Sequence, residues 1–533
     1  MFRFAVATSL ASSVICSEDS GWELLATSSG EEVPRTCYKN SGLTSLPEWA
    51  HGSYIISGPA KFEMGGIKFQ GLFDGYGRVN RFELREGEAC YTSAWLNTSY
   101  YLAAEKLGEI GPGVLFEGTT PDRPDCQKPF CDLEAPMDNN WINLLPVASG
   151  GLLINDSPQM LNLDLETLAV SGEHEWEDGA GRSPSWMPQY HTATMGSAHP
   201  VRRPKTEATH VAIMLSMSLM PLEPNYISIY SIDTTKGKRR DLIANVVVKG
   251  LQYFHSYGVS EHYVVLPCNL RMTARLEDIV GRPYMMDNFE EGWDGIYLVD
   301  LAGHVQKFET EKFFHVHVAN TFENETGVVM DVGAFTEVPF SKGPQLDIAQ
   351  FNNKTARDGT PRSNGELRRY VFHLEGEKKG QVTWQAVSAP DRLVDFFKIN
   401  DKWNGLPYCY VYSDEWFHDG EAYASMAIVK QNMCTGERTY WKAKDNYPGE
   451  PFFIPGPGRA EDDGLVIFVV LDGPKGISKL VVLDGKTFNE VATIELPQHI
   501  PFTAHGQFVQ AIAAKATKAM EGGKWPEDIA YLV

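Results

Sequence analysis

A short strand-turn-strand unit that recurs along the chain constrains the fold more than any other feature. In each copy an apolar or aromatic run leads into an acidic or amide residue and a turn, and a second run follows. The copies begin near residue 81 and continue almost to the end of the 533-residue chain. They are Arg81–Gly87, Met160–Leu168, Ile229–Gly237, Gly295–Gly303, Tyr370–Gly376, Ala427–Gly436 and Lys479–Gly485.

Turn residues at fixed places between short strands are typical of β-hairpins. A hairpin-bearing repeat of roughly 50 to 80 residues is typical of the blades of a β-propeller. We therefore predict an all-β fold of the propeller type. Two consecutive β-sandwiches are the alternative, because they contain similar strands, but they do not explain one repeat over the whole length.

Helical periodicity is scarce and is clearest at Ser99–Leu107 and Gln345–Asn352. Strand-turn units continue on both sides of the Pro-rich segments, which we interpret as loops that cap one face. Residues 20–533 are therefore predicted to form one domain. Residues 1–19 contain one Arg and no acidic residue before Glu18, a composition that fits either a plastid or secretory targeting peptide or an unfolded tail.

The charge balance excludes one class of partner. The chain carries 47 Lys and Arg against 69 Asp and Glu, a net charge of −22. Such an excess of negative charge repels phosphates, so we expect no nucleic-acid partner. The two short basic runs, Val201–Lys205 and Lys236–Arg240, lack interleaved aromatic residues and are interpreted as solvated turns.

The eight cysteines form no C-x-x-C pair and have no regular spacing. Because a chain of this length needs no disulfide framework, we interpret them as buried or free thiols in a reducing compartment. A cysteine-based metal site is not expected.

Four of the 14 histidines stand in apolar, strand-like surroundings near Gly, Ser or Pro: His199, His255, His317 and His505. Their wide spacing would place each on a different blade, and the innermost strands of a propeller converge on its central channel. Four neutral imidazoles would suit Fe(II), Zn or Cu. Each histidine taken alone is more typical of an ordinary buried side chain than of a metal ligand. His315 adds an ambiguity, because residues i and i+2 of a strand face the same side.

Around these histidines the sequence closely resembles the carotenoid cleavage oxygenases, over nearly the whole chain after about residue 20. Pro47–Tyr54, Ser57–Glu63 and Phe73–Gly75 are similar to the opening signature of that family, and the four histidine motifs follow in the expected order. These motifs are Ser197–Pro200, His255–Val265, His317–Glu323 and Pro501–Phe508. The register of the third motif implies that His317, rather than His315, is a ligand.

The resemblance implies a seven-bladed β-propeller with a cap of loops and short helices on one face, and Fe(2+) held on its axis by His199, His255, His317 and His505. It also implies outer carboxylates at Asp156, Asp395 and Glu450, each accepting a hydrogen bond from an imidazole. The family more commonly has Glu at all three positions. Asp is one methylene shorter, so at 156 and 395 the strand must lie closer, a water must bridge, or the bond is lost.

The implied activity is that of a non-haem iron(II) dioxygenase, which cleaves a conjugated double bond of a carotenoid or apocarotenoid with O₂. No catalytic residue beyond the metal ligands is implied. A retinoid isomerase-hydrolase acting on retinyl esters, a propeller that only binds carotenoid, and phenolic stilbene-type substrates are the alternatives. Because carotenoids reside in lipid, we expect peripheral membrane contact near Leu107–Phe116, with Cys126 as a lipid-modifiable residue.

Overall fold

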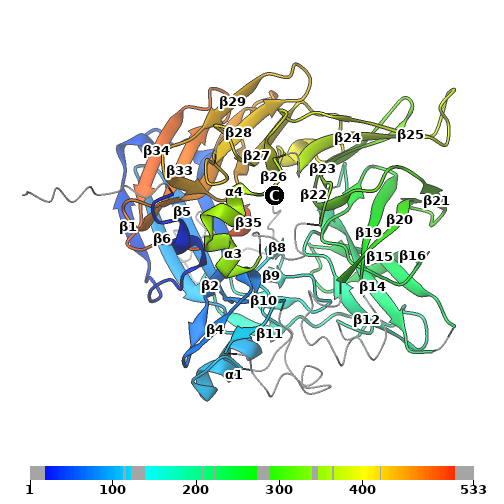
Figure 1. Ribbon diagram of the computed structural model, residues 1–533, viewed down its shortest axis with the longest axis horizontal. Coiled ribbons are helices and arrows are strands. Elements are labelled where there is room, and N and C mark those ends of the chain that lie inside the picture. Colours follow the sequence, from blue (N-terminus) through cyan, green and yellow to red (C-terminus); the bar gives the residue numbers. More distant parts are fainter. Residues whose placement is uncertain are drawn as a thin grey trace, which may run out of the picture.

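Antiparallel β-sheets form almost all of the fold in the computed structural model (Figure 1). The structure describes residues 19–111, 116–121, 138–179, 181–206, 208–220, 222–272, 289–338, 346–362, 365–420 and 422–510. Within these ranges there are eight sheets, of which seven contain four or five strands and one contains three. The expectations for residues 1–18 and for Cys126 lie outside the described residues.

The sheets follow one another along the chain, and Figure 1 shows them arranged around a common centre. One sheet joins the two ends of the described chain: β1 (Thr36–Lys39), β6 (Glu88–Trp95), β5 (Tyr76–Arg85), β2 (Gly52–Lys61) and β35 (Ala504–Val509). The next has the order β11 (Val170–Glu173), β10 (Leu161–Leu163), β9 (Gly150–Ile154) and β8 (Asn143–Val147). The third contains β12 (His191–Gly196), β13 (Val201–Arg202), β14 (Thr209–Ser218), β15 (Asn225–Asp233) and β16 (Arg240–Val248).

The remaining sheets repeat this plan. The fourth contains β17 (Leu251–Gln252), β18 (Gly258–Val259), β19 (Tyr263–Met272), β20 (Phe289–Asp300) and β21 (Val305–Phe308). The fifth contains β22 (Phe314–Asn324), β23 (Gly327–Phe335), β24 (Glu366–His373) and β25 (Val382–Ala386). The sixth contains β26 (Leu393–Lys398), β27 (Tyr410–Trp416), β28 (Ala427–Asn432) and β29 (Arg438–Trp441). The seventh contains β30 (Asn446–Pro448), β31 (Phe452–Pro455), β32 (Gly464–Asp472), β33 (Ile477–Asp484) and β34 (Glu490–Glu495). The small sheet contains β3 (Glu63–Met64), β4 (Ile67–Phe69) and β7 (Thr119–Thr120).

Helices are short and few. The α-helices of the described residues are α1 (Ser99–Leu107), α3 (Ile348–Asn352) and α4 (Lys354–Asp358), and the 3-10 helices are η1 (Trp22–Ala26), η2 (Ser41–Leu43), η3 (Glu48–Ala50), η4 (Leu72–Asp74) and η8 (Asp401–Trp403). The predicted helix at Ser99–Leu107 is confirmed, and α3 lies within the second predicted helix. No helix in the described part of the chain has the length and apolar character that a membrane span requires.

Each of the seven units found in the sequence forms a hairpin, and each hairpin belongs to a different sheet. In five of these turns the side chain of the acidic or amide residue accepts a hydrogen bond from an amide two or three residues further on, as in Asx turns. The five residues are Asp164, Asp233, Asp300, Asn432 and Asp484. Asp164 Oδ1 lies 2.7 Å from the amide nitrogen of Thr167, and Asp484 Oδ1 lies 2.6 Å from that of Thr487. Asn432 makes the same contact with Thr435, at 3.0 Å.

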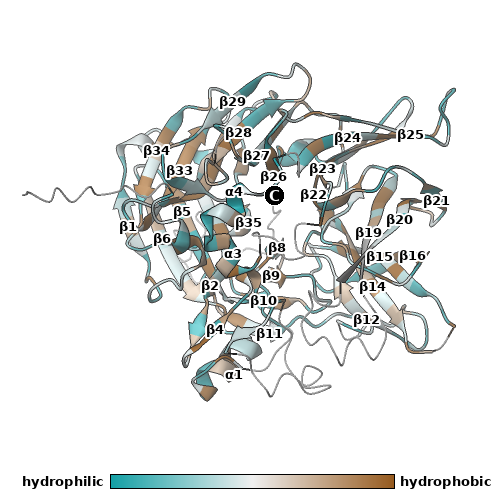
Figure 2. Ribbon diagram, in the orientation of Figure 1, coloured by the Kyte–Doolittle hydropathy of each residue, from teal (hydrophilic) through white to brown (hydrophobic). Residues whose placement is uncertain are grey.

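The apolar residues pack between neighbouring sheets. Val265 and Ile296 of one sheet, for example, pack against Val328 and Met330 of the next. Figure 2 shows hydrophobic residues along the strands and hydrophilic ones at the tip of the β24-β25 hairpin. Two consecutive sandwiches would give four sheets, so the observed sheets do not support that alternative.

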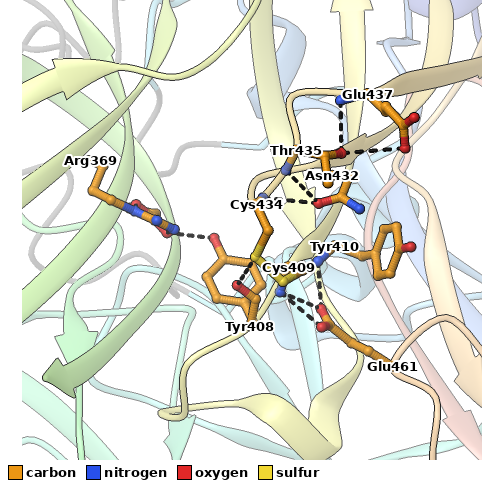
Figure 3. The surroundings of a disulfide bond; sticks show 10 residues. Arg369, Tyr408, Cys409, Tyr410, Asn432, Cys434, Thr435, Glu437 and Glu461 are labelled. Atoms are coloured by element: carbon orange, nitrogen blue, oxygen red, sulfur yellow. Dashed lines mark hydrogen bonds and ion pairs between the residues drawn. A yellow bond between two sulfur atoms is a disulfide. The ribbon is translucent and has the colours of Figure 1, made fainter.

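Two disulfide bonds correct the sequence interpretation of the cysteines. Cys37 and Cys90 lie opposite each other in the β1-β6 pair and are joined. Cys409, which precedes β27, is joined to Cys434 in the turn after β28 (Figure 3). Sequence spacing could not reveal either bond, because the register between strands brings the thiols together. Cys268 is a buried free thiol.

Candidate metal centre

The four candidate histidines come from the edge strands of four different sheets, or from the short segments that interrupt those strands. His199 lies between β12 and β13, and His255 lies between β17 and β18. His317 lies in β22 at a register shift, and His505 lies in β35 with a left-handed φ of 53°. Each histidine therefore occupies an irregular place on a strand, and such irregularities redirect a side chain from the face of the sheet.

These irregularities bring the imidazoles together. One nitrogen of each ring lies within 4.8 Å of the corresponding nitrogens of the other three. The Nε2 atoms of His199 and His255 are 2.9 Å apart, and those of His317 and His505 are 3.3 Å apart. His255, His317 and His505 are buried.

In three of the rings a carboxylate oxygen lies within hydrogen-bond distance of Nδ1, the arrangement that the sequence predicts. The Nδ1 atom of His255 lies 2.8 Å from Asp156 Oδ2, and that of His317 lies 2.9 Å from Asp395 Oδ1. His505 Nδ1 lies 3.1 Å from Glu450 Oε2. Asp156 and Asp395 therefore contact their histidines directly, although their side chains are one methylene shorter than that of glutamate.

Since a carboxylate only accepts hydrogen bonds, the Nδ1 atoms of these three rings carry the protons and their Nε2 lone pairs face the centre. Burial, followed by the charges of the three other imidazoles, lowers the pKa of His199 well below its ordinary value, which favours the neutral form of that ring. Facing lone pairs repel one another unless a cation lies between them. Two nitrogens held about 2.1 Å from one ion at right angles would be about 3.0 Å apart, so the cluster fits a metal ion.

His315 does not join the cluster. Its Nε2 lies 2.9 Å from the carbonyl oxygen of Ser256, to which it donates a hydrogen bond. The register shift between His315 and Val318 breaks the alternation of the strand, so His315 and His317 make different contacts. Burial lowers the pKa of His315 to about 4, which keeps this ring neutral as well.

Sequence reasoning missed the side chains that hold these segments in place. Ser197 Oγ donates to the carbonyl oxygen of His255 at 2.5 Å and accepts from the amide nitrogen of His199 at 3.1 Å. Ser256 Oγ lies 2.5 Å from the carbonyl oxygen before His317 and 3.0 Å from the amide nitrogen after it. Each serine thus links two histidine-bearing segments, and each is adjacent to or two residues from a candidate ligand in the sequence.

Asp156 is also held more firmly than the sequence indicated. Tyr253 Oη donates to Asp156 Oδ2 at 2.7 Å, and the amide nitrogen of Ala198 donates to Oδ1 at 3.0 Å. Tyr253 stands two residues before His255, which is the signal that could have identified it.

A model of the family described as retinal pigment epithelial membrane protein matches residues 27–510. The chain belongs to this family, the carotenoid cleavage oxygenases.

Named relatives span most of the chain. It is 24% identical over 521 residues to the β,β-carotene 15,15'-dioxygenase of Mus musculus, covering 87% of this chain and 88% of that protein. It is 23% identical over 501 residues to the carotenoid isomerooxygenase of Galleria mellonella, covering 87% and 92%. A variant of the Synechocystis apocarotenoid oxygenase has the same fold, with a TM-score of 0.76, 23% identity, and coverage of 92% of this chain and 98% of that one. A cobalt-substituted form of that oxygenase gives a TM-score of 0.75 at 23% identity, again covering 92% and 98%.

In this carotenoid cleavage oxygenase an apolar cavity of about 140 Å³ reaches the histidine cluster. His255, His317 and His505 line it together with many aromatic side chains: Trp22, Phe73, Phe116, Trp141, Tyr253, Phe335, Phe351, Phe396, Trp416, Tyr423, Tyr447 and Phe502. Tyr100 and Tyr101, by contrast, pack in a separate core.

A second cavity, of about 180 Å³, is more polar and is lined by His199 as well as by His317 and His505. Lys398, Glu450 and His210 also line it. The cluster therefore lies between an apolar cavity and a polar one, and the two environments suit an apolar ligand and small polar molecules respectively.

Proposed function

We propose that the protein is a non-haem iron(II) dioxygenase that cleaves a conjugated carbon-carbon double bond of a carotenoid or apocarotenoid. Both atoms of O₂ enter the products, which are two aldehydes or ketones. The observation that carries this proposal is a four-histidine cluster of which three rings line an apolar, aromatic cavity. Membership of the carotenoid cleavage oxygenase family supports it.

His199, His255, His317 and His505 would hold the iron, and Asp156, Asp395 and Glu450 would fix the orientation of three of the rings. Bound iron(II) would supply the activation of dioxygen. The outer carboxylates keep a proton on each Nδ1 and partly balance the charge of a divalent ion, since neutral imidazoles contribute none. No other side chain needs a catalytic role.

The cavity would position the substrate. A polyene offers no charge to recognise, so burial against aromatic side chains such as Phe396 and Phe502 must provide the affinity. The end of the cavity then decides which double bond lies beside the histidines. The apolar walls also exclude water from the reacting bond.

The seven larger sheets would be the blades of one closed propeller formed by residues 20–533, with η1, α3 and α4 in a cap over one face. The pairing of β35 with β2 supports closure, because it unites the last described strand with one of the first. Phe351 of α3 and Trp22 of η1 pack together and line the apolar cavity, which supports a cap at that end.

Peripheral membrane contact would give access to a lipid-soluble substrate. The described residues expose Leu102 and Leu107 on α1, next to the segment that the sequence indicated. They also expose Tyr190, Leu219 and Leu222. Exposed leucines and an aromatic residue at loop tips are the side chains that insert into a bilayer surface.

Isotope labelling tests the proposed reaction. Purified, iron-loaded protein is incubated with β-carotene, apocarotenals and retinyl esters under ¹⁸O₂, and the products are analysed by mass spectrometry. Labelled aldehyde or ketone from a polyene supports cleavage. Isomerised retinol without label would indicate the retinoid isomerase-hydrolase instead, and bound but unchanged polyene would indicate a carotenoid-binding protein.

A further inference from the structure

Asp414 is a carboxyl group in the wall of the apolar cavity with no role in holding a histidine. It lies on β27, and its side chain is only 2% exposed. It lines the cavity beside Trp416 and Met426. Its Oδ1 atom has no hydrogen-bond partner among the residues that the structure describes. The other two aspartates of this cavity, Asp156 and Asp395, each accept a hydrogen bond from an imidazole.

The surroundings of Asp414 make it a hydrogen-bond donor. It lies opposite Asp395 in the β26-β27 pair. Burial, followed by the negative charges of Glu450 and Asp395, raises the pKa of Asp414 well above its usual range. Burial and these charges favour the neutral carboxylic acid, and nothing on the described chain forms an ion pair that would favour the charged form. A neutral acid in an apolar site donates a strong hydrogen bond to an oxygen atom.

A buried polar group without a partner is costly, since its contacts with water are lost and nothing replaces them. Such a group persists where it serves a ligand or holds an unseen water. The rest of this cavity wall is predominantly apolar, so an oxygen atom on a bound polyene would find few other donors there.

We propose that Asp414 donates a hydrogen bond to a carbonyl or hydroxyl oxygen of the bound polyene, and so selects apocarotenoids and other oxygen-bearing polyenes over hydrocarbon carotenes. This inference rests on the proposed polyene-binding function of the cavity. Asp414 is then a positioning residue that fixes how far the polyene enters.

Equilibrium binding without turnover tests the proposal. Iron-loaded, full-length protein is titrated anaerobically with an apocarotenal and with the hydrocarbon of the same polyene length, by quenching of tryptophan fluorescence. We expect the wild type to bind the aldehyde at least about tenfold more tightly. Asp414→Leu should abolish this preference, while Asp414→Asn, which keeps a donor, should retain part of it. Ser413→Ala, on the opposite face of β27, is the matched control and should leave the preference unchanged.

The wild type alone supplies a second readout, in case a variant does not fold. The infrared carbonyl stretch of a ¹³C-labelled apocarotenal should fall on binding, as it does when an aldehyde accepts a hydrogen bond. An unshifted band would overturn the proposal. So would an unchanged aldehyde preference in Asp414→Leu.

Failure of this inference is distinct from failure of the proposed function. The first appears as equal binding of aldehyde and hydrocarbon by a wild type that still yields ¹⁸O-labelled products. The second appears as an absence of labelled products from every polyene, whatever the binding preference.

Discussion

The two aspartates that replace glutamate reach their imidazoles because the backbone lies close to the rings. Asp156 lies two residues after the end of β9, and its second oxygen accepts a hydrogen bond from the amide of Ala198. Asp395 lies against Gly333, where an added Cβ would be 3.3 Å from the carboxylate oxygen and 2.7 Å from the ring of Phe397. A glycine thus leaves the space in which the shorter side chain meets its histidine.

Removing one ligand should remove the metal. We expect His317→Ala to lose most of its bound iron, because three neutral imidazoles hold a divalent ion less tightly than four. His315→Gln is the matched control, since the amide can still donate to the Ser256 carbonyl and the residue lies outside the cluster. Metal content by elemental analysis checks both, and an equal loss in the two variants would contradict the assignment of ligands.

A buried histidine away from the cluster should make the protein sensitive to acid. Burial, followed by the charge of Arg202, lowers the pKa of His210 to about 4. An unfolded histidine titrates near 6.5, so the unfolded state binds more protons between pH 6.5 and 4 and stability falls as the pH falls through that window. His210 should therefore cost about 3 kcal/mol of stability at pH 4 relative to neutral pH.

The His210→Gln variant should lose this part of the acid sensitivity. Urea unfolding at pH 7 and at pH 5 measures the change for each protein. His304→Gln, at an exposed histidine, should retain the wild-type response. If the two variants respond alike, His210 is not the group that titrates.

At the level of the elements, one disulfide links the two central strands of the sixth sheet, β27 and β28, at one end. Cys409 and Cys434 join the start of β27 to the turn after β28 (Figure 3). The carboxylate of Glu461 also holds this point, accepting from the amides of Cys409 and Tyr410. Disulfides persist in oxidising compartments, so the two bonds do not fit the reducing compartment inferred from the cysteine pattern.

Loss of this bond should destabilise the fold. The bridge spans 25 residues, and a loop of that size corresponds to roughly 3 kcal/mol of constraint on the unfolded chain. We expect the double variant Cys409→Ser, Cys434→Ser to unfold at a lower urea concentration than the wild type. Peptide mapping without reductant should still find Cys37 joined to Cys90. Free thiols at 409 and 434 in wild-type protein folded under oxidising conditions would contradict the bond.

At the level of the whole molecule, the contact of β35 with β2 joins the ends of the described chain and also carries His505. Gly506 packs directly against the buried ring of Tyr54, since an added Cβ would lie 2.3 Å from Tyr54 Cε2. The pairing of β35 with β2 and the placement of a candidate ligand therefore depend on the same close approach.

A methyl group added at Gly506, where β35 packs against Tyr54 of β2, should affect both stability and metal binding. We expect Gly506→Ala to cost about 1 to 3 kcal/mol and to lower iron content, because His505 is the preceding residue. Gly111→Ala, where the nearest atoms lie 4.0 Å from the added Cβ, is the control and should be neutral. Thermal unfolding and metal analysis measure both effects. A Gly506→Ala variant that is as stable as the wild type and binds as much metal would contradict the close packing of Gly506 against Tyr54.

The sequence by itself determined the hairpins and the candidate site residues. The turns depend on side chains such as Asp164 and Asp484 that bond their own neighbouring amides, so a local pattern suffices to predict them. The ligand candidates, His199, His255 and His505, were recognised from short motifs.

Only the tertiary structure decided how those residues meet and what surrounds them. It separated His315 from His317, joined Cys409 to Cys434, and placed Asp414 in an apolar wall. Each of these outcomes depends on the register and separation of strands that are distant in the sequence. A shift of one residue turns a side chain to the other face of a sheet, and no local pattern of residues specifies that register.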